Sequence, residues 1–249
     1  MRQPAGSSTG AGVLSVDTDT PSVDEQDNTN RDADHVLAVP IVDLRIVLLT
    51  LDDGRLQVAL HASSDFLRLP RGAPERDRSL DTEARQIVRR AVGLREQYLE
   101  QLYTLTVTDN AGWTVVVSYL GLISSSRTLP LTSEGSWHNV AVLPPLSEPD
   151  RMVIDYALVR LRAKLGYTTV AFHLLPAVFT LSELQGAYEV ILNQRLDKRN
   201  FRRRVTAAGI LEATGAKKRD GSHRPALIYQ FRATDDRETY LTPKWAEGA

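Results

Sequence analysis

The strongest constraint on the fold lies near the C-terminus, where the pattern predicts a helix, a turn, a strongly basic helix and then a hairpin. The segment Thr180-Leu181-Ser182-Glu183 has capping-box spacing and opens the first helix. The second helix covers about residues 197–208, DKRNFRRRVTAA, and is followed by the turn-rich segment TGAKKRDGSHRP and a strand over 226–231. This order of elements predicts a winged helix-turn-helix domain over residues 167–232.

The basic helix has the residues that a DNA-reading helix needs. Phe201, Val205 and Ala208 recur at helical spacing and are predicted to face inward, which leaves the cations on the other sides. Residues 195–232 hold eleven Lys and Arg against three acidic residues, and such a positive field attracts phosphate. The predicted DNA contacts are Lys198, Arg199, Asn200, Arg202, Arg203 and Arg204 on the helix, and Lys217, Lys218, Arg219, His223 and Arg224 at the hairpin tip.

Two other interpretations of this basic surface stay open. One is a solvated charged face in a domain without a nucleic-acid partner, and the other is a module that binds RNA or a protein. Because the cations occupy both the second helix and the following hairpin tip, the pattern favours double-stranded DNA.

The N-terminal half predicts a mixed α/β domain over residues 36–148. Asp52-Asp53-Gly54 between two apolar β-like runs is a hairpin signature, and Gly93 ends a helix that starts at Leu80. Two further strands are predicted over 98–107 and 113–123, and a linker helix over 149–166 ends at Gly166.

The two ends of the chain differ in composition from the rest. Residues 1–35 contain seven acidic residues, two arginines and no aromatic residue, which predicts a disordered acidic tail. Residues 233–249 are predicted to form a flexible tail. The sequence has no cysteine, which excludes disulfides and thiolate metal sites, and no apolar run of membrane-spanning length. We therefore expect a cytoplasmic protein without a membrane partner.

Residues 72–94 can be laid on the Nudix box, G-x5-E-x7-R-E-U-x-E-E-x-G-U, without a gap. Gly72 takes its first glycine, and Gly93-Leu94 takes its last two positions. The positions that carry the chemistry differ, since the box's Glu, Arg-Glu and Glu-Glu are replaced here by Arg78, Gln86-Ile87 and Arg90-Ala91. Hard divalent cations need oxygen ligands, so we expect no catalytic residues, no metal site and no hydrolase activity. The alternative is a Nudix hydrolase with displaced ligands that acts on ADP-ribose or a related nucleoside diphosphate derivative.

The charged residues around this box have other expected roles. Glu75 and Glu83 do not occupy ligand positions and are predicted to be solvated. Arg71, Arg78 and Arg90 are candidate effector-binding residues, because arginine engages a nucleotide phosphate without a metal ion.

Longer passages of the chain resemble the Nudix-related transcriptional regulators of NAD metabolism, the NrtR family. These passages are YLEQLYTLTV (98–107), VVVSYLGLI (115–123), YALVRLRAKLGYTTVAFHLLP (156–176), FTLSELQGAYEVIL (179–192) and LDKRNFRRRV (196–205). The resemblance implies an α+β protein with an N-terminal Nudix-like α/β/α sandwich and a C-terminal winged helix-turn-helix. It further implies a homodimeric repressor of NAD biosynthesis or salvage genes that binds a double-stranded operator and a nucleotide effector.

The chain departs from the family pattern before the box. The segment His61-Ala62-Ser63-Ser64 is followed by a short path to Arg71-Gly72, where the family has an arginine pair and a longer loop. The degenerate box is similar to that of the NadQ-type regulators, which are associated with NAD or ATP. NAD, ATP and ADP-ribose therefore stay open as effectors, and no cofactor is expected to be required.

Overall fold

The computed structural model describes residues 39–63, 66–93, 98–109, 112–124, 131, 135–219 and 225–232. The described residues from Val39 onward belong to one compact unit. The predicted tails, 1–35 and 233–249, lie outside the described residues. Among the described residues, no helix is both long and apolar enough to cross a membrane.

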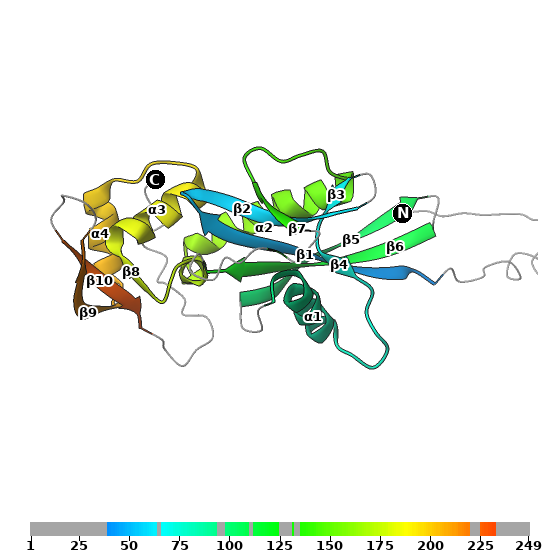
Figure 1. The fold of residues 1–249 in the computed structure, drawn as a ribbon, viewed down its shortest axis with the longest axis horizontal. Coiled ribbons are helices and arrows are strands. Elements are labelled where there is room, and N and C mark those ends of the chain that lie inside the picture. The colour runs from blue at the N-terminus through cyan, green and yellow to red at the C-terminus, as the bar shows by residue number, and fades with distance from the viewer. Residues whose placement is uncertain are drawn as a thin grey trace, which may run out of the picture. The chain divides into compact units, whose positions relative to one another are not determined.

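A mixed β-sheet forms the centre of the N-terminal half (Figure 1). Its order is β3-β2-β1-β6-β5, with β4 paired to β1 and β7 paired to β2, and β1 and β6 run parallel. Asp53 and Gly54, at φ of 45° and 66°, form the tight turn that the sequence predicts between β1 and β2. The strands are β1 (Ile41–Asp52), β2 (Arg55–Ala62), β3 (Leu67–Arg68), β4 (Arg71–Gly72), β5 (Tyr98–Asp109), β6 (Gly112–Ile123) and β7 (Gly135–Asn139).

Helices cover both faces of this sheet. Alternate residues of a strand point to opposite faces, and β1 is apolar on both of them. Leu44, Ile46 and Leu48 pack with α1 (Leu80–Val92), whereas Val47 and Leu49 pack with α2 (Glu148–Leu165). The predicted α/β/α sandwich is confirmed.

The described C-terminal part consists of a short 3-10 helix, two α-helices and a small sheet (Figure 1). A 3-10 helix, η2 (Val170–Leu174), precedes β8 (Val178–Thr180) and α3 (Leu181–Leu192), whose capping box joins Thr180 to Glu183 in both directions. The basic helix α4 (Lys198–Ala207) follows. Then β9 (Leu211–Lys218) and β10 (Ala226–Phe231) form an antiparallel hairpin that pairs with β8 through β10. The predicted winged helix-turn-helix arrangement is confirmed.

Two local predictions in this part are wrong. Ala208 is exposed and not inward-facing, because α4 ends at Ala207 and only Phe201 and Val205 are buried. Residues 214–218, predicted as turn, continue strand β9, since Lys217 and Lys218 pair with β10 at Leu227 and Ala226. The long-range strand pairing overrides the local preference of Gly215 for a turn.

Candidate functional site

The basic helix α4 is fixed by its cap and by two buried side chains. The Asp197 carboxylate accepts the backbone N–H of Asn200 at 2.7 Å, which satisfies one free donor of the first turn. Phe201 and Val205 are buried, and the Phe201 ring lies edge-on to Tyr188 of α3 with 5.3 Å between centroids. This packing holds one side of α4 against α3 and leaves the other sides for contacts.

The turn between α3 and α4 is organised by Glu189, a residue that the sequence analysis did not single out. Its Oε1 accepts from Gln185 Nε2 and from the Leu196 backbone N–H, both at 2.9 Å, and its Oε2 accepts from Arg195 at 3.2 Å. These hydrogen bonds, the one from the Leu196 backbone foremost, lower the pKa of Glu189. An ionised Glu189 therefore sets the geometry with which α4 follows α3.

The outward side of α4 carries the exposed residues Arg199, Arg203 and Thr206, which recur at i, i+4 and i+7. They stand away from the buried pair Phe201 and Val205. Guanidinium groups on this side suit both phosphate oxygens and the acceptor edge of guanine. This side is the best candidate for insertion into a DNA groove.

A second side of α4 faces the hairpin. Arg202 donates to Ser182 Oγ at 3.1 Å, and Lys218 Nζ donates to Glu183 Oε1 at 2.6 Å. With Lys198, these residues line a cavity of about 870 Å³ at the start of α3. Partial burial raises the pKa of Glu183, but the hydrogen bonds from Lys218 and Thr180 outweigh it and the net pKa is lowered. Two predicted DNA contacts, Arg202 and Lys218, are thus engaged with α3.

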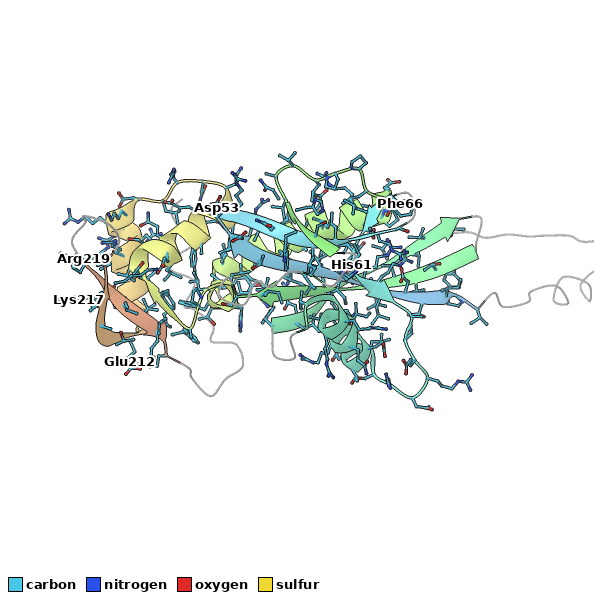
Figure 2. All side chains as sticks on the ribbon, in the orientation of Figure 1. Asp53, His61, Phe66, Glu212, Lys217 and Arg219 are labelled. Carbon is cyan, nitrogen blue, oxygen red and sulfur yellow. The ribbon has the colours of Figure 1, made fainter. Side chains whose placement is uncertain are left out.

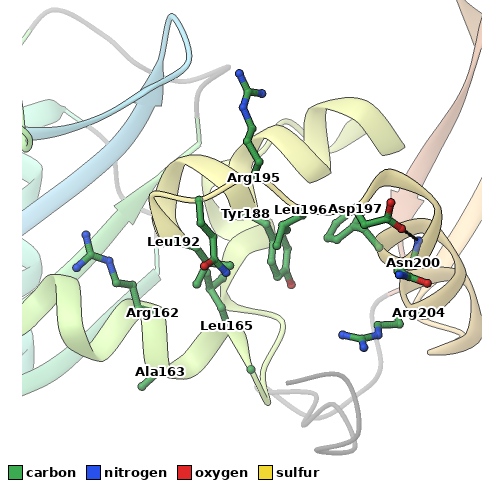
Figure 3. A pocket seen from close by; sticks show the side chains of 13 residues that line it. Arg162, Ala163, Leu165, Tyr188, Leu192, Arg195, Leu196, Asp197, Asn200 and Arg204 are labelled. Carbon is green, nitrogen blue, oxygen red and sulfur yellow. Dashed lines mark hydrogen bonds between the residues drawn. The ribbon is translucent and has the colours of Figure 1, made fainter. Parts of the chain in front are cut away.

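The third side of α4 faces α2 (Figure 3). Asn200 and Arg204, both predicted DNA contacts, line a cavity of about 500 Å³ together with Arg162 of α2. Leu165 of α2 and Leu192 of α3 supply part of its apolar lining. The structure therefore divides the predicted helix residues among three sides.

The predicted hairpin cations are only partly described. Lys217 and Arg219 are exposed near the end of β9 that leads toward β10, whereas Glu212 lies toward the other end of the strand (Figure 2). His223 and Arg224 lie outside the described residues. The described cations place positive charge on the same domain as α4, as a wing that contacts DNA backbone requires.

The structure places the first glycine of the predicted box against α1. A Cβ atom built on Gly72 would lie 3.2 Å from Ile87 Cδ1, so β4 passes close over this helix. Of the replaced positions, Ile87 and Ala91 are buried in the core, and Gln86 and Arg90 are exposed. Among the described residues, no group of three or more His, Cys, Asp or Glu is arranged to hold a metal ion.

The prediction that Glu83 is solvated is wrong. Its side chain is 2% exposed on the inner side of α1, with Arg90 at 3.4 Å and Arg78 at 3.6 Å. Arg78 also pairs with Glu75 at 2.9 Å. Glu83 is one helical turn before Ile87 and therefore on the same side, and the flanking guanidinium groups compensate its charge.

The third candidate effector residue, Arg71, lies on β4 apart from this cluster. Its guanidinium contacts both carboxylate oxygens of Asp43, at 2.6 Å from Nη2 and 3.2 Å from Nε. The Arg71 side chain is 36% exposed, whereas that of Asp43 is 8% exposed. Arg71 therefore presents part of a fixed guanidinium group to solvent.

Comparison with known proteins agrees with this arrangement. Residues 171–231 match the NrtR DNA-binding winged helix domain family. The chain is 31% identical over 210 residues to the ADPR responsive transcriptional repressor NtrR of Acinetobacter baylyi, covering 79% of this chain and 84% of the relative.

Solved structures lead to the same family. The crystal structure of Shewanella oneidensis NrtR complexed with a 27mer DNA is similar, with a TM-score of 0.70, 31% identity, and coverage of 77% of this chain and 93% of that one. A MutT/nudix family protein from Enterococcus faecalis, 22% identical with a TM-score of 0.62, shares the fold over 78% of this chain and 87% of its own. The chain belongs to the NrtR family of DNA-binding transcriptional repressors, which join a Nudix-like domain to a winged helix.

Proposed function

We propose that this repressor senses ADP-ribose through its Nudix-like part, residues 36–148, and reads an operator through residues 167–232. Residues 149–166 would act as the linker helix between them. The observation that carries the proposal is the outward side of α4, where Arg199 and Arg203 are exposed above a buried apolar side. Of the three effectors left open, ADP-ribose is favoured because the relative from Acinetobacter baylyi is an ADPR responsive repressor. The genes of NAD synthesis or salvage are the proposed targets.

A binding titration tests this function. The purified full chain is titrated against upstream regions of NAD synthesis and salvage genes from its own genome, with unrelated competitor DNA and with or without ADP-ribose, NAD or ATP. We expect saturable binding to one region and a change in its Kd with ADP-ribose. Equal affinity for every region would contradict operator recognition, and a response to NAD or ATP alone would reassign the effector.

We further propose that the Nudix-like part does not hydrolyse its ligand. In this family of folds, carboxylates on the helix after the box glycine hold the divalent cations that activate water. Here Ile87 and Ala91 contribute only apolar surface to the core, and the buried carboxylate of α1, Glu83, lies between two arginines. Incubation of ADP-ribose with the protein and Mg²⁺ or Mn²⁺ should release no AMP. Release of AMP in molar excess over the protein would contradict the proposal.

We propose a homodimer that uses the linker helix. Met152, Tyr156, Val159 and Ala163 follow one another at spacings of 4, 3 and 4 on the exposed side of α2. The first three are 50%, 42% and 61% exposed, and Tyr156 stacks on Tyr103 of the edge strand β5 at 4.7 Å between centroids. An apolar seam of this spacing is the pattern by which two helices pack. A second copy also supplies the two-fold symmetry that a palindromic operator requires.

Val159→Glu is expected to convert the dimer to a monomer, because a carboxylate in a helix seam loses its hydration without gaining a partner. Sedimentation equilibrium measures the mass of the particle, which should fall to that of a monomer. The apparent affinity for the operator should fall as well. Arg151→Glu is the matched control, since it changes charge on the exposed first turn of the same helix, where Arg151 pairs with Asp155. A dimer that survives Val159→Glu would show that the seam lies elsewhere.

Glu183→Gln is expected to raise affinity for non-specific DNA several-fold. Glutamine still closes the capping box with Thr180, but it releases Lys218 from its 2.6 Å ion pair so that a phosphate takes the lysine. One added phosphate contact steepens the slope of log K against log salt by about 0.9 per protomer. Glu212→Gln on β9 is the control, and an unchanged slope in Glu183→Gln would exclude competition between Glu183 and DNA.

A further inference from the structure

Four charged side chains form a continuous line from the surface at β4 to the first turn of α2. Arg71 contacts Asp43 at 2.6 Å, and Asp43 accepts from Arg45 Nε at 2.9 Å. Arg45 Nη1 donates in turn to Asp150 Oδ1 at 2.8 Å. The line joins three elements, β4, β1 and α2, and its two acids balance its two bases.

The burial of this line is graded. The side chains of Arg45, Asp43 and Asp150 are 7%, 8% and 2% exposed, whereas Arg71 is 36% exposed. Burying three charges is costly unless each keeps its partner, so removal of one contact forces the others to rearrange. Arg71 is the one member that a ligand in solution can reach.

The inner end of the line is tied to α2 and, through it, to the DNA-binding part. Asp150 also accepts the backbone N–H of Leu69 at 3.3 Å, and its own backbone N–H is bonded to the cap Ser147. The 18 residues of α2 form one continuous helix of about five turns, so its far end moves with its start. There Arg162 Nε donates to the backbone carbonyl of Ile191 on α3 at 2.9 Å.

We propose that Arg71 binds a phosphate group of the nucleotide effector and that Asp43, Arg45 and Asp150 are positioning residues that transmit this event to α2. The inference rests on the proposed sensing of ADP-ribose. Phosphate oxygens compete with Asp43 for the same guanidinium donors. When Asp43 loses Arg71, Arg45 is drawn more strongly to Asp43 and away from Asp150, which changes how the first turn of α2 is held. The ligand thereby favours one arrangement of α2 over another, as effector control requires.

Asp150→Asn separates transmission from binding. Asparagine keeps the size of the side chain and one acceptor oxygen, but it removes the charge that holds Arg45. We expect the affinity for ADP-ribose, measured by calorimetry, to stay within about threefold. Because the variant releases Arg45 as the ligand is proposed to do, DNA affinity without ligand should already be close to that of the ADP-ribose-bound unaltered protein. The ADP-ribose-induced change in DNA affinity, typically about 5- to 150-fold in such systems, should fall to less than about twofold. Asp155→Asn, an exposed change on the same helix, should respond like the unaltered protein.

A full ADP-ribose response in Asp150→Asn would overturn the proposed transmission. Should the unaltered protein itself show no response to ADP-ribose, the proposed effector fails instead, and the two failures are therefore distinct. Arg71→Gln tests the end of the line that the ligand would contact. Because the Arg71 side chain is partly exposed, this variant is expected to fold. It should weaken ADP-ribose binding by about tenfold or more. Because it also removes the contact to Asp43, it should shift DNA affinity without ligand toward that of the ADP-ribose-bound unaltered protein. Unaltered ADP-ribose affinity would overturn the assignment of Arg71.

Discussion

Replacing Arg199 and Arg203 together with alanine is expected to weaken operator binding by roughly 30-fold or more, because each arginine contact to a base or phosphate contributes about 1–3 kcal/mol. Both side chains are exposed on the outward side of α4, so their removal leaves the buried contacts of Phe201 and Val205 in place. Fluorescence anisotropy over a range of salt concentrations measures the effect. The salt slope should become shallower by up to about 1.8 per protomer if both contact phosphate.

The control for this variant removes the same charge from elsewhere. Arg55 and Arg151 are exposed on β2 and α2, and their double replacement by alanine changes the net charge equally. It should alter operator affinity by less than about threefold. If the two double variants bind alike, the outward side of α4 does not read the operator, and the sides that carry Arg202 or Arg204 become the alternatives.

Lys164→Met is expected to destabilise the protein by about 3 kcal/mol, which corresponds to a fall in Tm of roughly 6–12 °C for a chain of this size. Lys164 is 2% exposed, and its Nζ donates at 2.6 Å both to Glu100 and to the Tyr98 hydroxyl. Methionine fills the space, but among the described residues it leaves the Glu100 carboxylate, 18% exposed, with Arg160 at 3.8 Å as its one ion-pair partner. Thermal and urea unfolding measure the loss.

A double variant separates the cost of the unpaired charge from a packing defect. Glu100→Gln combined with Lys164→Met removes both charges, and its stability should return to within about 1 kcal/mol of the original. If the double variant is as unstable as Lys164→Met, the loss comes from packing and the ion pair has little part in it. Operator binding at low temperature should stay the same in both variants, because Lys164 does not lie on α4.

The C-terminal architecture was predictable because its signals are local. The capping box at Thr180 and the spacing of Phe201 and Val205 each fix structure within a few residues. The turn at Asp53-Gly54 in the N-terminal half was predictable for the same reason. The short strands β3, β4, β7 and β8 were not predicted. Each has only two to five residues, too few for a recognisable alternation. In addition, β4, β7 and β8 exist through pairing with a strand distant in sequence, which no local pattern encodes.

The candidate site was predictable in composition but not in geometry. The sequence indicates that α4 is basic, yet only the packed structure separates outward Arg199 from Arg202, which is bonded to Ser182. The burial of Glu83 was missed because its compensating arginines lie five residues before and seven residues after it, and charged residues at that distance are ordinarily solvated. The contact between Arg45 and Asp150 spans 105 residues of sequence.

A single continuous cluster of buried apolar side chains includes Leu49 of β1, Ile154 of α2, Tyr188 of α3 and Phe201 of α4. The two halves that the sequence predicts, one for the effector and one for DNA, therefore share one hydrophobic core. Because both halves contribute side chains to this cluster, loosening of one removes packing from the other. An exchange of the winged helix between relatives would therefore have to preserve the apolar surface that both halves share. New DNA specificities are more readily reached by substitutions on the exposed sides of α4 than by exchange of whole domains.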